Sequence, residues 1–197
     1  MPANLPPVWG DGGYRIAMIH DQLPASRPDV LPPLPDPYIW TYWQPGREQR
    51  WEEIQQAAEL YQHVTLNDFE RSFGFQEDNL SQRQLFIQDQ RDGELVGTAT
   101  AWFKPNYHGE PFGRVHWVAI HPDHQGRGLG RTLVVAALQR LKQLGHDRAF
   151  LTTATKRVPA IRLYLSLGFI PDWREEGSLG AWDTIRNCLP IPLPDPC

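Results

Sequence analysis

Cysteine is scarce in this sequence, with only Cys188 and Cys197 among 197 residues. Two cysteines do not form the disulfide framework of a secreted domain or a cysteine-based metal site, so we expect a reducing cytoplasm and no metal. Basic residues form no block, and a net charge of −4 with a pI near 6.0 makes nucleic acid a poor partner. No run approaches the ~20 apolar residues of a membrane span, and residues 1–13 lack the basic and apolar segments of a signal peptide. We therefore expect neither a nucleic-acid partner nor a membrane partner.

Proline and aromatic residues are abundant instead. The 19 prolines cluster at the two ends and between Pro24 and Pro45, while 41% hydrophobic and 11% aromatic residues are typical of a globular core. We expect a Pro-rich N-terminal extension over residues 1–37 with a candidate strand at Tyr14–His20, one folded domain over 38–189, and a tail over 190–197.

The most informative stretch runs from Arg114 to Leu144. The apolar run 115–120 predicts a buried strand, and the sequence His121-Pro122-Asp123 ends it, because proline disfavours regular pairing. A glycine-rich turn follows, and then apolar residues recur at helical spacing: Leu129, Leu133, Val134, Ala137, Leu138, Leu141 and Leu144. A strand, a glycine turn and a helix start together direct free backbone N–H groups at an anion.

The spacing of the glycines limits the classes of ligand that this turn could bind. A dinucleotide fingerprint needs a third glycine where Arg131 stands, which disfavours a nucleotide-binding oxidoreductase, and no Gly-Lys-Ser/Thr of a P-loop occurs. The pattern Gln-x-x-Gly-x-Gly, from Gln125 to Gly130, resembles the pyrophosphate loop of the GNAT superfamily of N-acetyltransferases. The resemblance implies an α/β (α+β) fold, a mixed and mostly antiparallel sheet flanked by helices, with acetyl-CoA as the acyl donor.

A second segment strengthens this resemblance. Residues 160–169 read AIRLYLSLGF, which is similar to the A-x-x-L-Y-x-x-x-G-F helix of the same superfamily. The resemblance covers about residues 82–189 and extends back less closely to about residue 38. It implies that Tyr164 points at the CoA sulfur and protonates the leaving thiolate. A core tyrosine on an amphipathic helix is the alternative.

The resemblance also implies the residues that bind the donor. The turn would bind the pyrophosphate through its backbone N–H groups, and Arg127 and Arg131 would add charge-assisted contacts unless they are solvated surface residues. Backbone groups of Val118 and Ile120 would pair with the pantetheine arm. The donor-binding residues expected are Val118, Ile120, Gln125, Gly126, Arg127, Gly128, Leu129, Gly130 and Arg131.

A general base is needed because an amine with a pKa near ~10.4 is mostly protonated at neutral pH. His116 is the candidate, since its segment resembles the arylalkylamine N-acetyltransferases of the superfamily; a structural histidine is the alternative. These enzymes carry a second histidine where this chain has Arg114. Side chains alternate along a strand, so we expect Arg114 and His116 on one face and Trp117 on the other. Arg114 would then lower the pKa of His116 and favour an anionic acceptor.

Other titratable and aromatic residues are weaker candidates. His121 and His124 flank the turn and are expected to be solvated or capping. Glu94 and Glu110 are alternative acids. Arg157 stands where the family often has asparagine. A group of four aromatic side chains lines an acceptor pocket or, more simply, packs in the core: Trp40, Tyr42, Trp43 and Trp102.

The rest of the pattern predicts an alternating order of strands and helices. An Asp-Gly pair joins two of the strands as a hairpin, and a loop over 104–113 precedes the central strand. The strands expected are 38–43, 84–88, 94–103, 148–153 and 181–189; the helices are 47–62, 66–75 and 158–167.

Together these features predict an N-acetyltransferase that transfers the acetyl group of acetyl-CoA to a primary amine of a small molecule or peptide by direct attack. The alternative is a non-catalytic acyl-CoA-binding module that acts as a sensor or binds a partner. The sequence leaves a homodimer open, and the acceptor is not readable from a fold.

Overall fold

The computed structural model describes residues 5–6, 8–9, 13–25, 30–74, 76–189 and 193. Most of the predicted tail, and parts of the predicted N-terminal extension, lie outside the described residues. The chain divides into two compact units, one formed by Leu23–Asp147 and the other by Met1–Gln22 together with Arg148–Cys197.

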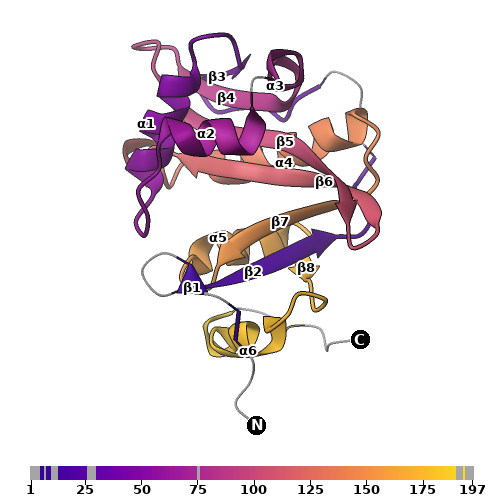
Figure 1. Ribbon diagram of the computed structural model, residues 1–197. Coiled ribbons are helices and arrows are strands. Elements are labelled where there is room, and N and C mark those ends of the chain that lie inside the picture. The colour runs from indigo at the N-terminus through magenta and orange to yellow at the C-terminus, as the bar shows by residue number, and fades with distance from the viewer. Residues whose placement is uncertain are drawn as a thin grey trace. The chain divides into compact units, whose positions relative to one another are not determined.

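The larger unit is built on an antiparallel sheet (Figure 1). Its strands are hydrogen-bonded in the order β3 (Tyr38–Tyr42), β4 (Gln84–Asp89), β5 (Leu95–Tyr107) and β6 (Glu110–Ile120). The predicted hairpin between β4 and β5 is confirmed, and Gly93 in its turn has a φ of 79°, which a residue without a Cβ adopts at little cost.

The loop predicted over residues 104–113 is wrong, because most of that segment is paired. Strand β5 continues to Tyr107 and β6 begins at Glu110, with only His108 and Gly109 between them. Both turn residues have positive φ, 53° and 92°, as the type I′ form of a two-residue hairpin turn requires. The rings of Tyr107 and Phe112 pack 5.3 Å apart, so the extended strands bury apolar area.

Helices pack on both faces of this sheet. Helices α1 (Glu48–Ala58) and α2 (Leu66–Phe73) lie in front of it in Figure 1, and α4 (Leu129–Gln143) lies behind it. A short helix that the sequence did not predict, α3 (Glu77–Arg83), precedes β4 and buries Leu80. The α1–α2 face encloses a core cluster that includes Trp43, Trp51, Ile54, Phe69, Phe73, Phe86, Trp102 and Ala119.

The smaller unit contains the predicted strand of the N-terminal region. Strand β2 (Gly13–His20) pairs antiparallel with β7 (Ala149–Ala154), from Arg15 opposite Ala154 to His20 opposite Ala149. Two short strands, β1 (Val8–Trp9) and β8 (Ile170–Pro171), also pair with β2. Helix α5 (Val158–Ser166) follows β7, as predicted.

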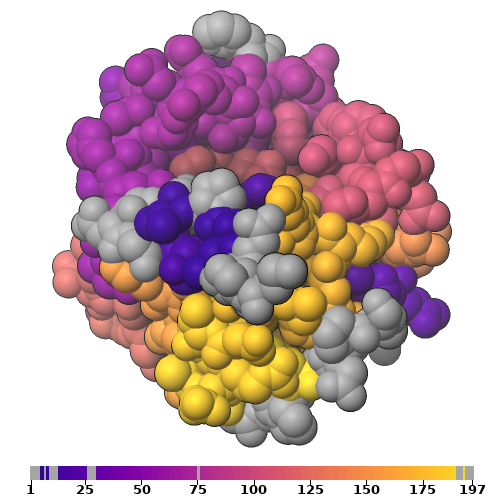
Figure 2. Space-filling view, turned by 60° about the horizontal axis from the view of Figure 1, so that its bottom comes forward, coloured from indigo at the N-terminus to yellow at the C-terminus, as the bar shows by residue number. Residues whose placement is uncertain are grey.

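The strand predicted over 181–189 is wrong. This segment contains the end of helix α6 (Ser178–Asp183) and a 3-10 turn, η2 (Arg186–Cys188). The successive residues Ala181 and Trp182 are both fully buried, which a helix allows and an alternating strand at a surface does not. The described residues near the C-terminus, yellow in Figure 2, form a surface of this unit. Leu179 of α6 is half exposed.

In the described part of the chain, no helix has both the length and the apolar character that a membrane crossing needs.

Candidate functional site

The glycine turn lies between the end of β6 and the start of α4. A 3-10 turn, η1 (Pro122–His124), begins it, and the His121 side chain accepts a hydrogen bond from the Asp123 amide at 3.4 Å, which confirms a capping role for His121. Gly126 and Gly128 both have left-handed backbone angles, with φ of 76° and 79°. A Cβ at either position would meet nothing within 4 Å, so the space beside the turn is open.

Backbone amides of the turn precede the first hydrogen bond of the helix α4. The first bond of α4 runs from the Thr132 amide to the Gly128 carbonyl at 3.2 Å, so the amides of Leu129 and Gly130 precede it. The Gln125 side chain ties the turn to the end of β6, because its Nε2 donates to the Ile120 carbonyl at 3.0 Å. Donors at the positive end of a 15-residue helix suit a pyrophosphate.

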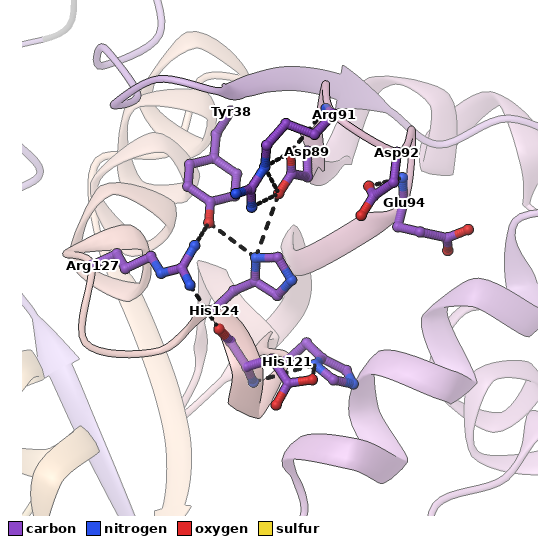
Figure 3. A network of polar contacts seen from close by, with 9 residues as sticks. Tyr38, Asp89, Arg91, Asp92, Glu94, His121, His124 and Arg127 are labelled. Carbon is purple, nitrogen blue, oxygen red and sulfur yellow. Dashed lines mark hydrogen bonds and ion pairs between the residues drawn. The ribbon is translucent and has the colours of Figure 1, made fainter.

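The two arginines of this region differ in their contacts. The Arg127 guanidinium donates to the Tyr38 hydroxyl and, at 3.1 Å, to the Asp123 carbonyl (Figure 3). Its side chain therefore binds protein groups, and we expect the Arg127 backbone rather than its guanidinium to meet the ligand. Arg131 is exposed in the first turn of α4.

His124 is neither solvated nor a cap, contrary to the expectation. Its side chain is only 15% exposed, and its Nδ1 lies 3.0 Å from the Tyr38 hydroxyl. The pKa of His124 is lowered, mainly by burial and to a smaller extent by the positive charge of Arg127. The sequence could not show this, because Tyr38 lies 86 positions earlier in the chain.

Strand β6 contains a β-bulge at the position predicted to be functional. Thr98 is opposite Ala119 and Thr100 is opposite His116, so Trp117 and Val118 together face the single residue between the two threonines. Trp117 has a φ of 50°, which is rare for a bulky side chain and marks local strain.

Two hydrogen bonds between Trp117 and the flanking helices hold the bulge. Gln55 of α1 donates from Nε2 to the Trp117 carbonyl at 2.8 Å, and the Trp117 indole donates to the Ser72 hydroxyl of α2 at 2.7 Å. The Trp117 ring also packs edge-on against Trp51 at 5.0 Å. These residues were not among the predicted site residues.

The bulge overturns the predicted separation of His116 and Trp117. The His116 ring lies 5.6 Å from that of Trp117 and 5.7 Å from that of Phe73, so both side chains face α1 and α2. Strict alternation fails because one extra residue enters the strand between the two pairing registers.

His116 has the electrostatics expected of a neutral base. Two effects lower the pKa of His116 well below 6.5. The larger effect is burial of the imidazole, and the smaller one is the positive charge of Arg114. The imidazole is therefore uncharged at neutral pH, and the predicted direction of the Arg114 effect is confirmed.

Replacing Gln55 by leucine should lower the free energy of unfolding by about 1–3 kcal/mol, because the part-buried Trp117 carbonyl loses its donor. Gln55 is only 5% exposed. Gln49→Leu is the matched control, since Gln49 is an exposed residue of the same helix, and it should change stability by less than about 0.5 kcal/mol. Urea unfolding of both variants measures the difference; equal changes would contradict a role for the Gln55 bond.

Tyr164 lies in α5 of the smaller unit, at 8% exposure, with its ring 5.9 Å from Phe169. Burial raises the pKa of Tyr164 to about 12, with Arg157 at the helix start acting in the opposite direction. The phenol therefore keeps its proton at neutral pH, as a proton donor must.

Four of the remaining candidates have contacts of their own, outside the glycine turn and the bulge. Trp43 and Trp102 belong to the core at 3% and 8% exposure, which supports packing rather than an acceptor pocket. The Trp40 indole donates to the Pro32 carbonyl at 2.8 Å, and Glu94 pairs with Arg50 at 3.1 Å. Among the described residues, no group of His, Cys, Asp and Glu could hold a metal ion.

Comparison with known families agrees with this geometry. The model of the Acetyltransferase (GNAT) family matches residues 40–169. The chain belongs to this family. Curated relatives include a mycothiol acetyltransferase from Thermobispora bispora, 33% identical over 74% of this chain and 51% of its own length. One from Thermomonospora curvata is 41% identical over 43% of this chain and 27% of its own. The chain thus spans about half the length of the first of these GNAT relatives, and less of the second.

Solved structures confirm the predicted fold class. A GCN5-related N-acetyltransferase from Sphaerobacter thermophilus aligns with a TM-score of 0.64 at 19% identity, over 80% of this chain and 48% of that one. A chain of the NatC complex bound to Gag peptide and CoA aligns with a TM-score of 0.57 at 16% identity, over 68% and 84%. The chain therefore has the GNAT fold, an α/β (α+β) arrangement of a mostly antiparallel sheet with flanking helices.

Proposed function

We propose that this protein is an acetyl-CoA-dependent N-acetyltransferase that acts on a primary amine of a small molecule or peptide by direct attack. The observation that carries the proposal is the turn before α4, where two left-handed glycines border open space. Membership of the acetyltransferase family supports it. Because relatives are named mycothiol acetyltransferases, the amine substrate of those enzymes is the first acceptor to test.

The donor would be bound by backbone groups. Residues 125–131 supply amides for the pyrophosphate, and Val118 and Ile120 supply strand groups for the pantetheine arm. Support comes from the bulge, because neither Trp117 nor Val118 has a partner in the pairing of β5 with β6, and the Trp117 carbonyl is already bound by Gln55. A backbone group outside the ladder is a donor or acceptor left for a ligand.

His116 would accept the proton of the amine, directly or through water. Its lowered pKa keeps the imidazole neutral, and a neutral imidazole is the form that acts as a base. Arg114 would favour acceptors that carry an anionic group, because a fixed cation attracts them.

Tyr164 would protonate the thiolate that leaves when the amine attacks the thioester. The support is the motif of residues 160–169 and the raised pKa, which keeps the phenol protonated until the thiolate forms. Since the sequence has few cysteines and no metal pattern, we place the reaction in the cytoplasm and require no metal. Thiol release from acetyl-CoA with a panel of amines separates this function from a non-catalytic acyl-CoA-binding module, which would bind CoA without turnover.

Gly128→Glu should weaken CoA binding on the order of tenfold or more, because the new carboxylate repels the phosphates beside the helix start. Isothermal titration calorimetry measures the affinity. Gly46→Glu is the matched control, since Gly46 also has a positive φ, 90°, and nothing within 4 Å of its Cβ position. It creates the same strain away from the turn and should leave affinity unchanged. Unchanged CoA affinity in a folded Gly128→Glu protein would contradict the assignment.

A further inference from the structure

A network of five polar side chains connects the edge of the sheet to the glycine turn (Figure 3). We call it the anchor network; its members are Tyr38 of β3, Asp89 of β4, Arg91 after β4, His124 of η1 and Arg127 of the turn. Tyr38 and Asp89 are direct partners in the pairing of β3 with β4. The glycine turn is thus attached to two strands that lie far from it in the sequence.

The chemistry of these side chains fixes which of them donates and which accepts each hydrogen bond. A guanidinium can only donate, so the Tyr38 oxygen accepts from Arg127. The single Tyr38 proton is then left for His124 Nδ1, 3.0 Å away. His124 accepts there only as a neutral imidazole with its proton on Nε2, in agreement with its lowered pKa.

Asp89 is the fixed negative charge of the network. Its side chain is fully buried at 0% exposure, and Arg91 donates to both of its oxygens, from Nε to Oδ1 at 3.0 Å and from Nη2 to Oδ2 at 2.5 Å. These bonds from Arg91 are the main cause that lowers the pKa of Asp89 to about 2, so it remains ionised. Its Oδ2 lies 3.9 Å from His124 Nδ1, and the aromatic rings of Tyr38 and His124 pack edge-on at 5.8 Å.

The network also includes a hydrogen bond between two residues of the turn region. Arg127 donates from its other nitrogen to the Asp123 carbonyl at 3.1 Å. It therefore joins the residues on either side of Gly126, whose backbone is left-handed. Tyr38 is only 5% exposed, so the point to which Arg127 is tied is held rigidly in the sheet.

We infer that Tyr38 and His124 are positioning residues that fix the glycine turn in the conformation that binds the pyrophosphate of the acyl donor. This inference rests on the proposed function, since it names residues that serve the same donor site. Neither side chain needs to touch the donor: Tyr38 holds Arg127, His124 orients the Tyr38 hydroxyl, and Arg127 holds the turn. Preorganisation of this kind reduces the ordering cost at binding.

A positioning role for the glycine turn predicts a result that a general role in stability does not. Loss of the anchor should harm a donor that carries the pyrophosphate and spare one that lacks it. Acetyl-CoA and S-acetylpantetheine form such a pair, because they share the reacting thioester and differ in the pyrophosphate and nucleotide part. A defect in the catalytic residues or in folding would affect both donors alike.

The experiment compares Tyr38→Phe with Tyr42→Phe. The first removes only the hydroxyl of the network, and the second removes the hydroxyl of Tyr42, a residue of the same strand that is 38% exposed and outside the network. We expect Tyr38→Phe to raise KM for acetyl-CoA and Kd for CoA on the order of tenfold, with kcat within about twofold. The kcat/KM for S-acetylpantetheine should stay within about twofold, and Tyr42→Phe should match the wild type throughout.

A second pair of variants tests His124. His124→Asn keeps an acceptor near the position of Nδ1 and should retain most of the CoA affinity, whereas His124→Leu should lose it as Tyr38→Phe does. Equal losses for both donors, or CoA affinity unchanged in both Tyr38→Phe and His124→Leu, would overturn the inference. If the wild-type protein bound no CoA, the proposed function would be wrong. The amide NMR shifts of Gly126 and Gly128 in the unliganded protein would then still decide whether Tyr38 positions the turn: the shifts should change in Tyr38→Phe and not in Tyr42→Phe, and unchanged shifts in Tyr38→Phe would refute the positioning role.

Discussion

Replacing Tyr164 by phenylalanine should reduce kcat on the order of 10²–10⁴-fold while the fold and CoA binding are retained. The substitution keeps the aromatic ring, which lies 5.9 Å from Phe169 at 8% exposure, and removes only the hydroxyl. A thiolate that leaves without a proton donor is a poorer leaving group, and general acid catalysis is worth this factor. The pKa of about 12 keeps the phenol protonated across the working pH range, so the loss should be independent of pH near neutrality.

The measurement is single-turnover thiol release under conditions where chemistry limits the rate, together with calorimetry of CoA binding. Tyr14→Phe serves as the control, because Tyr14 is a partly buried tyrosine of strand β2 in the same unit. It should behave as the wild type. A Tyr164→Phe enzyme within twofold of the wild-type kcat would remove Tyr164 from the mechanism, and an equal loss in Tyr14→Phe would point to a general effect of the hydroxyl deletions.

The sequence predicted the elements whose signals are local. The glycine turn could be predicted because the conformations of Gly126 and Gly128 depend on the missing Cβ of those residues themselves, and both have positive φ. The helix after the turn follows from apolar residues at a period of 3.6, and the Asp-Gly hairpin follows from turn chemistry. These are properties that a short segment carries without its neighbours.

The parts that sequence reasoning missed depend on distant partners. The bulge of β6 is defined by its register with β5, and Gln55 of α1 holds it from 62 positions away. Tyr38 meets His124 only because β3 pairs with β4 at the level of Asp89. Helix α6 was mistaken for a strand because a short apolar run fits either structure, and tertiary burial of Ala181 and Trp182 decides between them.

His116→Ala should lower kcat/KM on the order of 10²–10⁴-fold near neutral pH, because no group would take the proton of the amine. The sign of the pH dependence follows from the pKa of His116, which burial and Arg114 lower well below 6.5. The base is active when neutral, so the acidic limb of the wild-type profile that His116 causes should lie below pH 6.5. The variant should lack that limb. Its residual rate should rise about tenfold per pH unit toward the pKa of the amine, near ~10.4, as free amine becomes available.

His63→Ala is the control, since His63 is an exposed histidine of the larger unit and has no part in β6. Its pH profile should match the wild type, while the profile of His116→Gln should match that of His116→Ala, because an amide cannot act as a base at these pH values. Recovery at high pH is what separates the loss of a base from a damaged strand: free amine needs no base, but a displaced β6 would still fail to hold the donor. A wild-type acidic limb that persists in His116→Ala would assign the limb to another group and exclude His116 as the base.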